Sequence, residues 1–189
     1  MNALPDVEAL ARADEETLLK LWEGLGYYNR VRNLGKAAGQ VMEQYNGIIP
    51  DEYDELCKLA GIGSYTAGAV ASIAYGKPVP AVDGNVLRVI SRVRMDDGDI
   101  MQAKVRKRVE EDLRRIMPQG RSGAFNQALM ELGAIVCIPN GEPKCMECPW
   151  ESFCMSHANQ CMSQYPRKTP KKARTIEYKT VLVLQDAQK

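Results

Sequence analysis

The sequence predicts an all-α protein. Its apolar residues recur at the spacing of three and four positions that amphipathic helices require, for example at Leu34, Ala37, Ala38 and Val41, and again at Val105, Val109 and Leu113. The 189 residues, 45% of them hydrophobic, are enough to form a packed core. Only residues 178–184 have the composition of a β-strand, and no second run offers them a partner.

Start and stop signals divide the chain into successive helices. Asp14, Glu15 and Glu16 begin one helix, because acidic groups stabilise its positive end, and the glycines at 24 and 26 end it. By the same signals, further helices are expected at residues 29–47, 51–59, 65–75, 84–92, 102–117 and 122–136.

Charge and cysteine usage restrict the class of protein. The net charge of +1 gives no overall reason to expect a nucleic acid partner, so a DNA-binding face would have to come from local basic stretches at 30–36, 104–115 and 167–179. Each stretch could equally be a solvated surface. There is no leader and no apolar run of membrane-spanning length, so we expect a reducing cytoplasmic or nuclear location and no membrane association.

A helical hairpin is expected at residues 54–76, around the turn Gly61-Ile62-Gly63. Glycines there permit positive φ and the close approach of another backbone. The N–H groups that begin the second helix could bind a phosphate. Read alone, the same pattern also fits an ordinary helix-turn-helix corner.

The loop after the hairpin carries a family resemblance. Residues 76–86 read GKPVPAVDGNV, and with the hairpin they resemble the helix-hairpin-helix glycosylase superfamily, in particular MutY-type adenine DNA glycosylases. The resemblance places Asp83 at the family's essential carboxylate. A fixed carboxylate would stabilise the positive charge that develops on the sugar when an N-glycosidic bond breaks. Asp83 could also be a simple helix N-cap, and the two roles are compatible.

Tyr65 and Asn85 are the other catalytic candidates. Endonuclease III-like relatives, which act on oxidised pyrimidines and cleave the strand, carry a lysine at the position of Tyr65 that forms a Schiff base. Tyrosine cannot form that imine, so the resemblance implies a monofunctional glycosylase, with Tyr65 and Asn85 in its active site. The endonuclease III-like activity and a non-catalytic DNA-binding module remain the alternatives.

The resemblance also implies a catalytic glutamate on a helix that lies before Met1. Glu8, Glu15, Glu16 and Glu23 match other parts of the family. Because loss of a general acid costs on the order of 10²–10⁴-fold in rate, we expect this polypeptide to bind DNA and to release adenine poorly.

Residues 21–30, LWEGLGYYNR, match a family segment that contacts DNA beside the lesion. Tyr27 is the expected wedge, with Leu25 and Arg30 as further DNA contacts, because a planar side chain can fill the space that a flipped base leaves. Trp22 and Tyr28 are expected in the core.

Four cysteines, Cys137, Cys145, Cys148 and Cys154, are separated by seven, two and five residues. They resemble the C-x6-C-x2-C-x5-C loop that holds a 4Fe-4S cluster in the family, with one residue inserted in a turn-rich gap. A zinc site or no metal remain alternatives. His157 is expected at the surface, Cys57 in the core, and Cys161 is a fifth thiol of uncertain role.

The resemblance gives three segments: a helical barrel at 1–117, an iron-sulfur domain at 118–162, and at 163–189 a linker with the first strand of a further β-rich domain. The expected partner is double-stranded DNA with A:8-oxoguanine or A:G mispairs, bound by a monomer. In the family, lesion preference depends largely on that further domain, so we expect it to be weakened here.

Overall fold

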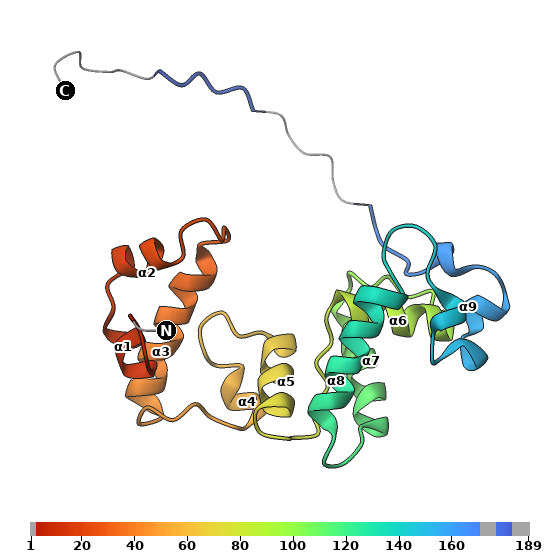
Figure 1. Cartoon of the computed structure of the whole chain (residues 1–189), viewed down its shortest axis with the longest axis horizontal. Coiled ribbons are helices and arrows are strands. Elements are labelled where there is room, and N and C mark those ends of the chain that lie inside the picture. The colour runs from red at the N-terminus through yellow and green to blue at the C-terminus, as the bar shows by residue number, and fades with distance from the viewer. Residues whose placement is uncertain (1–2, 171–176, 183–189) are drawn as a thin grey trace.

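The computed structural model describes residues 3–170 and 177–182, and all regular structure within them is helical (Figure 1). The all-α prediction is therefore confirmed. The longer elements are α1 (Val7–Arg12), α2 (Glu15–Leu21), α3 (Asn29–Gln44), α4 (Tyr53–Leu56), α5 (Ser64–Ile73), α6 (Gly84–Arg94), α7 (Ala103–Ile116) and α8 (Ser122–Glu131). The π-helix η1 (Leu132–Val136) continues α8, and the short elements η2 (Cys145–Glu147), η3 (Glu151–Phe153), α9 (Met155–Ala158) and η4 (Met162–Gln164) follow.

Aspartates fix where three of these helices begin. Asp6, Asp14 and Asp83 each accept a hydrogen bond from the backbone N–H three residues later, over 2.8, 2.7 and 2.8 Å. Each side chain satisfies a donor that a helix start would otherwise leave free. The predicted start at Asp14 is confirmed, and Asp83 is an N-cap as anticipated.

Two hydrophobic clusters form the core. The first joins α3, α4 and α5 through Ala37, Val41, Leu56, Leu59, Ala67, Ala71 and Val79. The second joins α6, α7 and α8 through Val82, Val86, Leu87, Ile90, Ile100, Val105, Val109, Leu113 and Leu129. Figure 1 shows α1–α3 at one end and α6–α9 at the other, with α4 and α5 between them. The loop before α6 contributes Val79 to one cluster and Val82 to the other, so it links the two halves.

Several predicted elements differ from the structure. The helix expected at 51–59 is only the single turn α4, and the helix expected at 122–136 ends in a π-helix. Residues 177–182 are not in a strand and have no strand partner among the described residues. The strand expected at 178–184, whose partners would belong to a further domain, therefore stays a prediction. Residues 183 and 184 lie outside the described residues.

The chain after η4 remains attached to the loop between α6 and α7. The carbonyl of Arg167 accepts a hydrogen bond from the N–H of Ile100 at 3.1 Å, and the guanidinium of Arg167 lies 3.2 Å from the carboxylate of Asp97. Thr169 donates to Asp99. In the described part of the chain, no helix is both long and apolar enough to cross a membrane.

Candidate functional site

The two glycines of the predicted hairpin have different surroundings. Gly61 has φ +75°, and a Cβ placed on it would lie 2.6 Å from the Cβ of Asn33 in α3. A Cβ on Gly63 would meet nothing within 4 Å. Gly63 is also the N-cap of α5, and no side chain of the described residues caps this helix. The first turn of α5 therefore faces open space with N–H groups that an external acceptor could use.

Helix α5 lies directly against the loop that leads to Asp83. A Cβ on Gly68 would overlap the carbonyl oxygen of Pro80. Gly68 thus allows the close approach of the loop that follows α5, so the hairpin and the candidate catalytic loop form one packed unit.

Both carboxylate oxygens of Asp83 are held in place. Oδ1 accepts the N–H of Val86 at 2.8 Å, and Oδ2 accepts the side-chain amide of Asn85 at 2.9 Å. The Asp83 side chain is half-buried at the first turn of α6. The carboxylate is thus fixed in orientation before any ligand binds, which is the arrangement that electrostatic stabilisation of a cation needs.

A buried arginine connects Asp83 to the cysteine segment. Arg88 is 6% exposed, and its Nη2 donates to Asn85 Oδ1 at 2.9 Å and to the carbonyl of Gly133 at 2.6 Å. Its Nε donates to the carbonyl of Cys137 at 2.8 Å. Burial lowers the pKa of Arg88, while the charges of Cys137 and Asp83 oppose that shift. Continuous hydrogen bonds therefore run from Asp83 through Asn85 and Arg88 to Cys137.

The π-helix η1 makes this connection possible. Its wider turn places the N–H of Cys137 2.7 Å from the carbonyl of Leu132, five residues earlier. Gly133 within it approaches Asn85 so closely that a Cβ on Gly133 would lie 2.6 Å from the Cβ of Asn85. Single π turns are frequent at functional sites, and this one brings two backbone carbonyls to Arg88.

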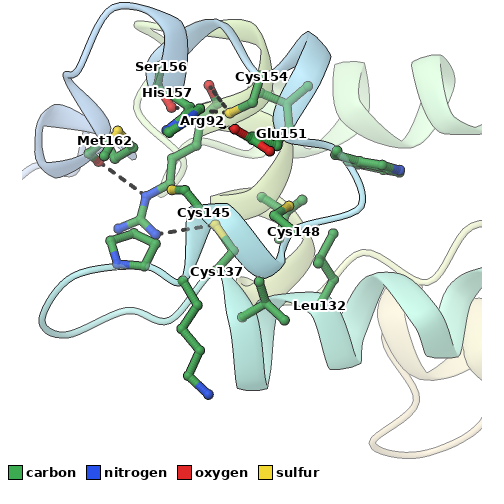
Figure 2. A pocket seen from close by; sticks show the side chains of 16 residues that line it. Arg92, Leu132, Cys137, Cys145, Cys148, Glu151, Cys154, Ser156, His157 and Met162 are labelled. Atoms are coloured by element: carbon green, nitrogen blue, oxygen red, sulfur yellow. Dashed lines mark hydrogen bonds and ion pairs between the residues drawn. The ribbon is translucent and has the colours of Figure 1, made fainter.

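The four predicted cysteines line one pocket (Figure 2). Arg92, 5% exposed, enters this pocket and donates to Cys137 Sγ at 3.3 Å and to the carbonyl of Ile138 at 2.9 Å. Burial, and to a smaller extent the other cysteines, raises the pKa of Cys145 and of Cys148. Among the described residues, no three His, Cys, Asp or Glu side chains converge as ligands of a single ion.

The remaining cysteines and the single histidine lie differently. Cys57 is exposed, so its predicted core position is wrong. Cys161 is buried outside the pocket lining, with its thiol 3.7 Å from the carbonyl of Ser156. His157 was expected at the surface but lines the pocket, with its Nδ1 buried and without a hydrogen-bond partner among the described residues. Glu151 lies 3.4 Å from its Nε2.

The predicted wedge segment is exposed as expected. Tyr27 is 79% exposed with φ 50°, and the guanidinium of Arg30 lies 5.0 Å from the centre of its ring. Leu25 is 66% exposed. The indole of Trp22 donates to the carbonyl of Gly26 at 2.9 Å and thereby holds the turn. Trp22 is partly buried, and the predicted core position of Tyr28 is wrong because that side chain is 41% exposed.

Tyr65 and the pair Asp83–Asn85 have separate contacts. The hydroxyl of Tyr65, on the first turn of α5, lies 3.5 Å from the sulfur of Met130 in α8. The side chain is 39% exposed. Asp83 and Asn85, in contrast, bind each other directly. The structure thus brings two of the three catalytic candidates together and places the third against α8.

Sequence reasoning missed Arg88 and Arg92. Both are buried and contact Cys137 or its carbonyl. A signal was present, because Arg88 lies one turn and Arg92 two turns after Asn85 on α6, which puts both cations on the buried face of the helix. A cation at such a position requires partners, and the cysteine segment supplies them.

Comparison with known proteins gives consistent matches. Residues 1–119 match the family described as HhH-GPD superfamily base excision DNA repair protein. The chain is 36% identical over 168 residues to an adenine DNA glycosylase of Buchnera aphidicola, covering 89% of this chain and 48% of that protein. It is 44% identical over 155 residues to the adenine DNA glycosylase of Homo sapiens, covering 82% and 28%. The chain therefore spans about half or less of the length of these relatives.

Solved structures agree with the fold. A thermostable thymine-DNA glycosylase superposes with a TM-score of 0.71 at 27% identity, covering 84% of this chain and 72% of that one. An endonuclease III in a non-covalent complex with DNA superposes with a TM-score of 0.70 at 30% identity, with the same coverage of 84% and 72%.

Proposed function

Because the chain belongs to the HhH-GPD superfamily of base excision DNA repair proteins, we propose that it is the DNA-binding and catalytic part of an adenine DNA glycosylase. Its partner is double-stranded DNA in which adenine is mispaired with 8-oxoguanine or guanine. The observation that carries the proposal is the Asp83 carboxylate, held by Asn85 and by the backbone of α6. The adenine DNA glycosylases among the similar proteins support the choice of base.

As the bond between C1′ and the base nitrogen breaks, the bonding electrons leave with the base, which takes up a proton from solvent, and positive charge develops on the sugar. Water then adds to C1′ and releases one proton to solvent, so the net reaction consumes one water molecule. Asp83 stabilises that charge without a covalent bond, and its fixed orientation avoids reorganisation during the reaction. Tyr65 has no amine, so the chemistry is hydrolysis without strand cleavage.

DNA contacts come from two exposed turns. The open first turn of α5, at Gly63, binds a backbone phosphate through its N–H groups, and Gly61 and Ile62 form the turn before it. Tyr27 fills the space of the flipped base, with Leu25 beside it and Arg30 against its ring. The left-handed backbone conformation of Tyr27 presents the ring to the DNA without a rearrangement of the turn.

Cys137, Cys145, Cys148 and Cys154 would hold a 4Fe-4S cluster. The fit rests on four thiols around one pocket and on the buried guanidinium of Arg92, which donates to Cys137 Sγ and offsets thiolate charge. When bound, the cluster supplies iron–thiolate bonds that cross-link this segment. Through the carbonyl of Cys137, Arg88 then ties the segment to Asn85. This site is structural in the proposed function.

The test compares two abasic duplexes opposite 8-oxoguanine, one with a cationic pyrrolidine in place of the sugar and one with neutral tetrahydrofuran. The polypeptide should bind the cationic duplex about tenfold more tightly or better, and Asp83→Asn should abolish that preference. Equal affinity of the unchanged protein for both would contradict the role of Asp83. With base-containing duplexes, release of an oxidised pyrimidine or a borohydride-trapped adduct would instead indicate glycosylase-lyase chemistry.

A further inference from the structure

A buried amide on α8 binds the loop that carries Asp83. Asn126 is 1% exposed. Its Nδ2 donates to the carbonyl of Val79 at 2.9 Å and to the hydroxyl of Ser72 at 2.7 Å, and its Oδ1 accepts the N–H of Ala81 at 3.0 Å. One side chain thus joins three segments: α8, the last part of α5, and the loop two residues before Asp83.

The loop needs such a partner because it is irregular and buried. Residues 79–82 are all buried and lie outside any helix. Their polar backbone groups cannot reach water, so each must find a partner inside the protein. Asn126 supplies partners for Val79 and Ala81, and Arg106 of α7 donates to the carbonyl of Val82. The conformation that delivers Asp83 to α6 is therefore set by side chains from neighbouring helices.

Close packing leaves the loop little room to adjust. A Cβ on Gly68 of α5 would overlap Pro80, and a Cβ on Gly123 of α8 would lie 2.9 Å from the carbonyl of Ser72. The loop thus sits tightly against α5, and α5 sits tightly against α8. A change at Asn126 would be transmitted along the loop because both of its ends are fixed.

We propose that Asn126 is a positioning residue for the reaction, which sets the place of the Asp83 carboxylate through Val79 and Ala81. The inference rests on the proposed function of Asp83. Asn126 is buried, so it acts through the segments that it bonds and not on the substrate directly. A shift of about 1 Å in a reacting group can cost on the order of 10²-fold, so small changes in this loop have measurable consequences.

The experiment measures the ratio of the affinity for the cationic abasic duplex to the affinity for the neutral one, for five proteins: the unchanged polypeptide, Asp83→Asn, Asn126→Ala, Asn126→Ser and Ser122→Ala. Ser122 is the matched control, because it is also 1% exposed on α8 and bonds the same loop, but at Gly76, seven residues before Asp83. Asn126→Ser is included as a milder change, whose hydroxyl can still bond one loop group. Thermal unfolding of each variant is recorded in parallel.

We expect Asn126→Ala to lower the ratio by about threefold or more, while its affinity for the neutral duplex stays within about twofold. Ser122→Ala should keep the ratio. If Asn126→Ala does not fold, Asn126→Ser should show the same selective loss. A folded Asn126 variant that keeps the ratio, or that loses affinity for both duplexes equally, overturns the inference. No preference in the unchanged protein would instead refute the role of Asp83 itself.

Discussion

Asn85 donates its side-chain amide to the carboxylate of Asp83 across 2.9 Å. The oxygen of the same amide accepts a hydrogen bond from Arg88 at 2.9 Å, so the orientation of Asn85 is fixed from both sides. The donor end must face Asp83, because Arg88 can only donate. This relationship ties the candidate catalytic carboxylate to a buried cation, and it defines which substitutions should matter.

Arg88→Gln should lower the free energy of unfolding by about 2–4 kcal/mol, because the buried carbonyls of Gly133 and Cys137 would lose their donor. The matched control on the same helix is Arg94→Gln. Arg94 pairs with Asp112 and its side chain is 52% exposed, so this change should cost less than about 1 kcal/mol. Denaturant unfolding measures both, and equal losses would show that Arg88 is not a structural link.

Gly133→Ala should lower stability by about 1–3 kcal/mol, because its Cβ would press against Asn85 at 2.6 Å. Gly39→Ala is the opposite case. Gly39 lies inside α3 with open space around it, so the change should stabilise the protein by about 0.5–1 kcal/mol. Thermal unfolding distinguishes the two, and a harmless Gly133→Ala would mean that η1 can move away from α6.

Gly61→Ala and Gly63→Ala should separate packing from binding. The first introduces a clash with Asn33 at positive φ and should lower the melting temperature. The second meets no protein atom, so it should leave the melting temperature nearly unchanged and weaken binding to any duplex, because the added methyl group stands where a phosphate approaches. Unchanged DNA affinity in Gly63→Ala would argue against the hairpin as a phosphate site.

Tyr27→Gly should weaken DNA binding without lowering the stability of the protein. Glycine adopts the φ of 50° at this position without strain, so the folded protein should be as stable or slightly more stable. Loss of the ring should weaken binding to an A:8-oxoguanine duplex by about tenfold or more relative to a fully matched duplex, since the flipped base leaves an unfilled gap. Fluorescence anisotropy measures both affinities, and an equal loss for the two duplexes would contradict a wedge.

Cys148→Ser should abolish the brown colour and the iron content of the purified protein, whereas Cys57→Ser, outside the pocket, should retain both. The unchanged polypeptide should contain about four irons, with broad visible absorption. Metal and acid-labile sulfide analysis would decide the point. A colourless protein with one zinc per chain would refute the iron assignment.

Most of the longer helices, and the starts at Asp14 and Asp83, were predictable because their signals are local. Asp14 and Asp83 each cap the helix that follows directly in the sequence, and the apolar spacing of α3 and α7 needs no knowledge of distant segments. The cysteine spacing likewise drew attention to four residues that line one pocket. No three of these side chains converge as ligands of a single ion among the described residues, so the cluster stays a prediction.

The rest depends on contacts between distant parts of the chain. Arg88 reaches Cys137 over 49 positions, and Asn126 reaches Ala81 over 45. Neither partner could be chosen from the sequence, because any buried polar side chain is satisfied by whichever backbone the fold brings near it. His157 was misplaced for the same reason, since a lone histidine carries no local signal of burial.

The contact between Gly68 and Pro80 has a further consequence. Because of it, the hairpin turn and the Asp83 carboxylate belong to one rigid block. The turn would bind the duplex, and the carboxylate would face the sugar. In the proposed complex, the nucleotide that reaches Asp83 is then the one that lies a fixed distance along the strand from the bound phosphate. Discrimination between bases has to arise from surfaces other than this block.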